Sequence, residues 1–135
     1  MRLLDKDINL HEVSPLTLAF IGDGVYDLLV RENLVCEANR PVGVLNAAKI
    51  KTVNCKAQAD AVKRMLELLD EEETAVYRRG KNAHAATVPK NARRSDYHAA
   101  TGLEALFGYL YLKGDIERLR TLFSVVEDNI IEEEE

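Results

Sequence analysis

Two carboxylates stand inside apolar, helix-like segments, and they are the residues of this sequence best suited to chemistry. Asp23 lies between two glycines in the segment 18–26, and Glu104 lies in the equally apolar segment 101–112. Aspartate weakens a helix interior, and each glycine costs up to about 1 kcal/mol relative to alanine, so helix stability alone does not explain this pattern. Small neighbours leave room for a ligand or for another backbone to approach.

A buried carboxylate must be paired, neutralised or bound to a metal ion. For either acid alone, a helix cap or a buried ion pair is the simpler interpretation. Two such acids, together with a basic segment that lies between them in the sequence at residues 78–94, instead suggest Mg²⁺-assisted chemistry on phosphodiesters. Hard divalent cations prefer oxygen ligands, and phosphate oxygens would complete the coordination shell.

A candidate phosphate-binding surface lies between residues 78 and 94, where six basic residues occur without an acidic one. The whole chain of 135 residues has 18 basic and 23 acidic residues, and its net charge of −5 alone argues against a nucleic-acid partner. Without these six basic residues, the rest of the chain has 12 basic and 23 acidic residues. The segment is therefore either a solvated loop or a basic strip for phosphates, formed by Arg78, Arg79, Lys81, Lys90, Arg93 and Arg94.

The composition is that of an ordinary globular protein. With 47% hydrophobic and 30% charged residues, global disorder is excluded, and the length predicts one domain over residues 1–135. No apolar run approaches the roughly 18 residues that a membrane span needs. Cys36 and Cys55 lack CxxC spacing and predict unpaired, buried thiols in the reducing cytoplasm.

The apolar spacing predicts an all-α protein. Ser14 and Pro15 are typical of a helix start, and Asp70 with Glu73 has the spacing of a capping box. Gly80 and Gly114 are expected to end helices, and Asp115 is expected to cap the last one. We therefore expect helices from Pro15 to about residue 38, over 44–69 with a possible break at 52–54, over 71–79, from Ser95 or Asp96 to about 113, and over 116–131, followed by a frayed tail over 132–135.

Several of these segments resemble Mini-ribonuclease III, the compact bacterial relative of ribonuclease III that lacks a double-stranded-RNA-binding domain. The resemblance covers residues 16–112, and it depends on five pieces in the correct order with matching gaps. They are SPLTLAFIGDGVYD at 14–27, KAQA at 56–59, RGKNA at 79–83, PKN at 89–91 and TGLEALFGYLYL at 101–112.

This resemblance implies an all-α ribonuclease III endonuclease domain that forms a homodimer. It implies Mg²⁺-dependent cleavage of double-stranded RNA, leaving 5′-phosphate and 3′-hydroxyl ends, and maturation of the large-subunit (23S) ribosomal RNA precursor. A large-subunit ribosomal protein is a candidate helper. By position, Asp23 and Glu104 match the catalytic, metal-binding acids. Two further acids of full-length ribonuclease III correspond here to Ala19 and Thr101, as in the reduced mini form.

The remaining site residues are assigned through the same resemblance. The basic strip, together with Asn82, is expected to contact RNA phosphates. Thr101 and Asp27, which lies one turn after Asp23, are candidates for supporting the metal ligands, with a surface or dimer-interface pairing as the alternative for Asp27. His84 stands where close relatives often have lysine, so its phosphate contact is weakened.

Two other functions stay open from the sequence alone. The first is a non-catalytic, ribonuclease III-like protein that binds RNA or assists ribosome assembly. The second is a helical protein-interaction module, which the net acidity and an alanine-rich face over residues 47–61 would suit. The presence of both Asp23 and Glu104 favours the enzyme.

Overall fold

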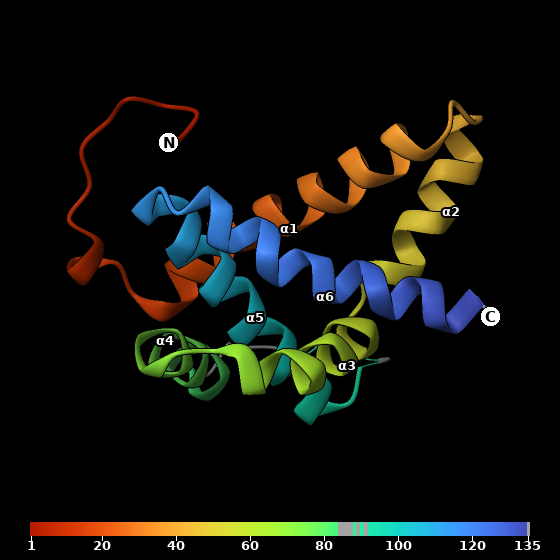
Figure 1. Ribbon diagram of the computed structural model, residues 1–135. Helices are drawn as coiled ribbons and strands as arrows, with labels where there is room; N and C mark the ends of the chain where they lie inside the picture. Colours follow the sequence, from red (N-terminus) through yellow and green to blue (C-terminus); the bar gives the residue numbers. More distant parts are fainter. Residues whose placement is uncertain (84–87, 89, 91, 135) are drawn as a thin grey trace.

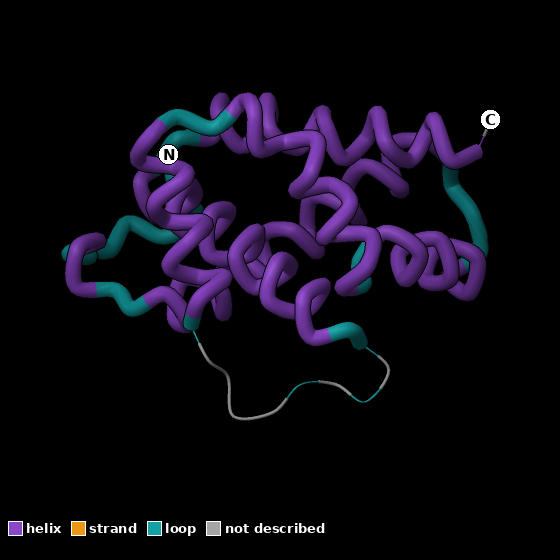
Figure 2. The backbone as a smooth tube through the Cα atoms, turned by 90° about the horizontal axis from the view of Figure 1, so that it is seen from below, coloured by secondary structure: helices purple, strands orange, loops and turns teal. Residues whose placement is uncertain are grey.

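The fold is built from helices whose ends are fixed by local sequence. The structure, a computed structural model, describes residues 1–83, 88, 90 and 92–134, with side chains as far as Glu127, and that part of the chain contains helices, turns and no strand (Figures 1 and 2). None of its helices is long and apolar enough to cross a membrane. The helices are η1 (Leu10–Glu12), α1 (Pro15–Glu37), α2 (Val42–Thr52), α3 (Cys55–Met65), η2 (Leu66–Leu68), α4 (Glu71–Asn82), α5 (Arg94–Lys113) and α6 (Ile116–Glu134).

The predicted helix starts are confirmed by their hydrogen bonds. The Ser14 side chain accepts from the backbone N–H of Thr17 at 3.3 Å, and Pro15 occupies the first helical position. Asp70 and Glu73 form the reciprocal capping box, with bonds of 2.8 and 3.0 Å. The possible break at 52–54 is real, because Asn54 accepts from the N–H of Ala57 and starts α3.

Four predicted boundaries are wrong. Helix α2 begins at Val42, two residues before the expected start at 44. Helix α4 does not stop at Gly80, because this glycine is a packing residue: a Cβ there would lie 2.6 Å from the Cβ of Ala105. Helix α5 begins at Arg94, without a side-chain cap from Ser95 or Asp96. The backbone of α6 continues to Glu134, so the acidic run over 132–134 is helical where fraying was expected. The prediction of two buried thiols is also wrong, because Cys36 is exposed and Cys55 is only partly buried.

Helix α5 is the central element of the fold. It packs against α1, α3, α4 and α6, and Figure 1 shows it running through the middle of the molecule. All residues from Ala100 to Leu110 are buried except Glu104, which is partly buried. Leu103, Leu106 and Phe107 are completely inaccessible and form the centre of the hydrophobic core. Glu104 is therefore the one partly exposed residue in a stretch of α5 that is otherwise buried.

Two glycines allow α1 and α5 to cross with their backbones in contact. A Cβ on Gly22 would lie 1.6 Å from the carbonyl oxygen of Glu104, and a Cβ on Gly108 would lie 2.0 Å from the carbonyl oxygen of Leu18. Both distances are far below any possible contact, so neither position accepts a side chain without separating the helices. Gly24 differs from them, since nothing lies within 4 Å of a Cβ built there.

An ion pair between the buried Glu73 and the partly exposed Arg118 connects the start of α4 to α6. Arg118 donates from Nε to Oε2 of Glu73 at 2.7 Å and from Nη2 to Oε1 at 2.8 Å. The Glu73 side chain is 4% exposed. Its hydrogen bond with Arg118 lowers the pKa of Glu73 below its ordinary value, against the effect of burial. A third bond from Nη2 reaches the carbonyl of Leu68 at 2.6 Å, so one guanidinium holds three elements together.

We expect Arg118→Gln to lower the free energy of unfolding by about 3 kcal/mol, because it leaves Glu73 buried without its cation. Urea titration at pH 7 measures this loss. Because the folded-state pKa of Glu73 is depressed, the pair stabilises the wild type above the unfolded-state pKa and less as the pH falls below it.

Arg120→Gln is the matched control, since Arg120 pairs with Glu117 on the exposed face of the same helix at 3.2 Å. That variant should lose no more than about 0.5 kcal/mol. Equal losses of unfolding free energy in the two variants would mean that the Glu73–Arg118 pair stabilises the fold no more than an exposed pair does.

Candidate active site

The crossing of α1 and α5 brings together the two acids that the sequence singled out. Gly22 rests against the Glu104 backbone, so the next residue, Asp23, lies beside the Glu104 side chain. The two carboxyl groups are within hydrogen-bonding reach of each other. Asp23 is exposed and Glu104 is partly buried, so the pair is accessible from solvent.

Neither acid is a helix cap, and no ion pair joins either one to a described residue. Burial raises the pKa of Glu104 to about 8, and the hydrogen bond to Asp23 and its negative charge act in the same direction. Without a cation, the pair therefore retains a proton at neutral pH. The two simpler explanations, a cap and a buried ion pair, do not hold for these residues.

The donor set fits a hard divalent cation that completes its shell elsewhere. Within the described residues, no group of three or more His, Cys, Asp or Glu side chains is arranged to hold a metal ion. Ala19 offers no donor, and the buried Thr101 hydroxyl donates to the Tyr97 carbonyl at 3.0 Å. Two carboxylates with facing oxygens can hold such an ion, with water and substrate oxygens as the other ligands.

Asp27 is engaged away from the carboxylate pair. Its carboxylate accepts from Nε of Arg31 at 2.6 Å and lies 3.4 Å from Nζ of Lys49 on α2. These bonds join α1 to α2, which corresponds to the surface pairing named above as the alternative for this residue.

Three residues near the pair were not identified from the sequence. The pKa of the Cys55 thiol is raised by burial and by the charges of Glu104 and Asp96, so both acids lie near the start of α3. Burial and the charge of Glu104 likewise raise the pKa of Tyr26. Tyr26 lies one turn after Asp23, a spacing that could have indicated it, but no sequence signal relates residue 55 to residue 104.

The basic strip is divided between two elements. Arg78, Arg79, Lys81 and Asn82 lie on the C-terminal half of α4, while Arg93 and Arg94 lie at the start of α5. These six residues and Lys90 are exposed, and none of the basic ones forms an ion pair within the described part of the chain. Gly80 packs on Thr101 and Gly102, so this half of α4 borders the part of α5 that leads to Glu104.

The strip on α4 does not form one face. Residues two positions apart on a helix point about 200° apart, so Arg79 and Lys81 project to opposite flanks. Arg79 lines a hollow of about 410 Å³ with Leu10 and Glu72, on the side of the N-terminal segment. His84, and Pro89 and Asn91 of the PKN motif, lie outside the described residues.

Comparison with known proteins gives one consistent result. Residues 16–115 match the model of the ribonuclease III domain family. Over 113 residues the chain is 49% identical to Mini-ribonuclease 3 of Thermoanaerobacter sp. (strain X514), covering 84% of this chain and 80% of the relative. It is 41% identical to Mini-ribonuclease 3 of Symbiobacterium thermophilum, covering 86% and 89%. A crystal structure of a Fusobacterium nucleatum protein superimposes with a TM-score of 0.85 at 29% identity, covering 96% of this chain and 99% of that chain.

We expect Glu104→Gln to stabilise the protein in metal-free buffer at pH 7, by about 1–3 kcal/mol, because the amide is neutral without the proton that Glu104 must take up on folding beside Asp23. The folded-state pKa of Glu104 is raised, so its contribution to stability falls as the pH rises from about 4.5 to about 8. Thermal unfolding across this pH range should show that decline in the wild type and not in the variant. A variant no more stable than the wild type at pH 7 would contradict the assigned burial.

Proposed function

Because this chain belongs to the ribonuclease III family, we propose that it is an endoribonuclease that cleaves double-stranded RNA at the Asp23–Glu104 pair. Family membership makes it a nuclease acting on RNA, as the sequence motifs indicated. The observation that carries the proposal is the pair of facing carboxylates, which have no cationic partner among the described residues. A ribosome-assembly role without catalysis would not require this costly arrangement.

Mg²⁺ is the proposed cofactor, held by Asp23 and Glu104. When bound, a divalent cation activates a water for attack and offsets the charge that develops on the scissile phosphate. The chain's own contribution is to fix two oxygen donors on two rigid helices. Asp23 is open to the substrate, and the buried surroundings of Glu104 strengthen its interaction with a cation. Thr101 and Asp27 are proposed only to support the positions of the two metal ligands. Thr101 does so through its bond to the α5 backbone, and Asp27 through its contact with Lys49 of α2.

Substrate binding is assigned to the basic residues of α4 and α5 and to Lys90 and Asn82. They are exposed and leave their charges available for phosphates. A-form RNA is recognised mainly through backbone shape and 2′-hydroxyls, so we expect little base specificity. The sequence resemblance supports the 23S ribosomal RNA precursor as the cellular substrate, with action in the cytoplasm and a large-subunit ribosomal protein as a possible helper.

A homodimer is proposed from an exposed apolar row on α1. Leu16 is 40% exposed, Phe20 84% and Leu28 55%, and with Gly24 they recur at four-residue steps along one face. Such a row on a surface helix is typical of an interaction surface. Gly24 has no internal packing role, so a second α1 could approach it closely. The row runs beside Asp23, which would place the two sites of a dimer near its interface.

We expect Asp23→Asn to reduce cleavage of a double-stranded RNA at least about 100-fold, because it removes one of two cation ligands. Folding and RNA binding should stay near wild type, since Asp23 is exposed. Gel assays of cleavage and binding with Mg²⁺ measure both. Chelation should abolish wild-type cleavage, and added Mg²⁺ should restore it. RNA binding without cleavage by the wild type would instead support the non-catalytic alternative.

Replacing Lys81 and Arg94 together with glutamine should weaken RNA binding. The slope of log affinity against log salt should fall by about one for each phosphate that the variant no longer neutralises. The control replaces Lys63 and Arg120, two exposed basic residues outside the strip, in the same way. If the two double variants have the same slope, the strip is only a solvated surface.

Phe20→Glu should convert the protein to a monomer in light scattering, because it puts a charge into the apolar row. Leu66→Glu, at an exposed leucine of η2, should leave the mass unchanged. A monomeric wild type would remove the basis for the dimer.

A further inference from the structure

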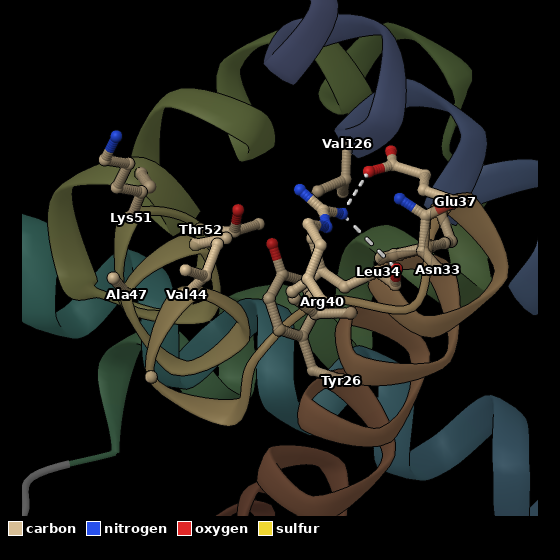
Figure 3. A pocket seen from close by; sticks show the side chains of 15 residues that line it. Tyr26, Asn33, Leu34, Glu37, Arg40, Val44, Ala47, Lys51, Thr52 and Val126 are labelled. Carbon is tan, nitrogen blue, oxygen red and sulfur yellow. Dashed lines mark hydrogen bonds and ion pairs between the residues drawn. The ribbon is translucent and has the colours of Figure 1, made fainter.

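A partly enclosed cavity lies between the C-terminal half of α1, helix α2 and α6 (Figure 3). Its volume is about 610 Å³, which falls in the range of small-molecule sites. Much of its wall is apolar, with Val30 and Leu34 from α1, Val44 from α2, and Phe123 and Val126 from α6. None of the residues assigned to cleavage or RNA binding lines it.

Two buried polar atoms at this cavity have no hydrogen-bond partner in the described part of the chain. They are the hydroxyl of Tyr26, a residue only 1% exposed, and Nε of Arg40. Figure 3 shows the Tyr26 hydroxyl directed into the cavity, between Thr52 and Arg40. A buried donor without an acceptor is costly, and two at one cavity indicate an acceptor-bearing occupant.

The charges around the cavity favour an anion. Nη2 of Arg40 donates to Oε2 of Glu37 at 3.0 Å and lies 3.4 Å from the Leu34 carbonyl, which leaves Nε for another acceptor. Lys51 also lines the cavity and forms no ion pair within the described residues. The residues that line the cavity therefore include two cations and one carboxylate, which leaves one positive charge without a partner among them.

We propose that this cavity binds a small carboxylic acid with an apolar body. The carboxylate accepts hydrogen bonds from Arg40 Nε and the Tyr26 hydroxyl, and the body packs against Val44 and Val126. A neutral apolar molecule would leave both donors unpaired, and a bare anion would leave the apolar walls without contacts. Neither Asp23 nor Glu104 lines this cavity, so the inference does not rest on the proposed function.

Benzoate is a suitable probe, because it carries one carboxylate on an apolar ring. Titration followed by amide NMR shifts should saturate at residues 44 and 52 with a dissociation constant of roughly 1 mM, as expected for so small a ligand. Benzyl alcohol, which lacks the charge, should bind at least about five-fold more weakly, and acetate, which lacks the body, should not saturate. The proposal is overturned if benzoate gives no saturable shifts up to about 50 mM, which would mean that only water fills the cavity, or if benzyl alcohol binds equally well.

Substitutions at the cavity test where benzoate binds. Arg40→Met should weaken benzoate binding about ten-fold, whereas Glu37→Gln should strengthen it, because the competing carboxylate is removed. Ala47→Phe fills the exposed side of the cavity and should abolish binding without changing the helical circular dichroism. Unchanged affinity in both Arg40→Met and Ala47→Phe would place benzoate elsewhere and refute the assignment. All readouts are of binding, so a failed cleavage assay would leave this result intact.

Discussion

The contact between the backbones of α1 and α5 is the constraint on which this structure depends. Helices that present ordinary side chains to each other lie 8–10 Å apart. Gly22 and Gly108 remove the side chains at the crossing, and each rests on a carbonyl of the other helix. This contact sets the relative position of Asp23 and Glu104 through the backbone. It also brings Tyr26 onto Phe107, with ring centroids 5.4 Å apart, so the core and the site share one crossing point.

The acids of the site and the basic residues of α4 and α5 are kept apart in this molecule. The acids of the site are held close together at a cost in stability, while the basic residues of α4 and α5 stand in solvent without carboxylate partners in the described part of the chain. The net charge of −5 therefore does not describe the local charge near the C-terminal half of α4, which is positive. Glu73 and Arg118, by contrast, are joined by two hydrogen bonds and stabilise the fold where α4 begins.

Sequence patterns predicted the helical class, most helix starts and the two acids, because these depend on local rules. Capping at Ser14 and Asp70 requires only three or four neighbouring residues, and both acids stood out against apolar surroundings. Gly80 was misread because a glycine at a helix end and a glycine at a helix crossing look identical in sequence, and only the position of Ala105 distinguishes them. Cys55 and Arg40 acquire their surroundings through tertiary packing, which no local pattern contains.

The near-complete burial of α5 from residue 100 to residue 110 has a dynamic consequence. Amide groups on a central, enclosed helix exchange with solvent through the largest opening events, often through global unfolding, whereas exposed segments open locally. Glu104 is thus carried on the element that opens last, and Gly22 couples Asp23 to the same cooperative unit. The carboxylate pair should therefore keep its geometry through the local fluctuations that affect α2 and the chain ends, and lose it only when the domain as a whole unfolds.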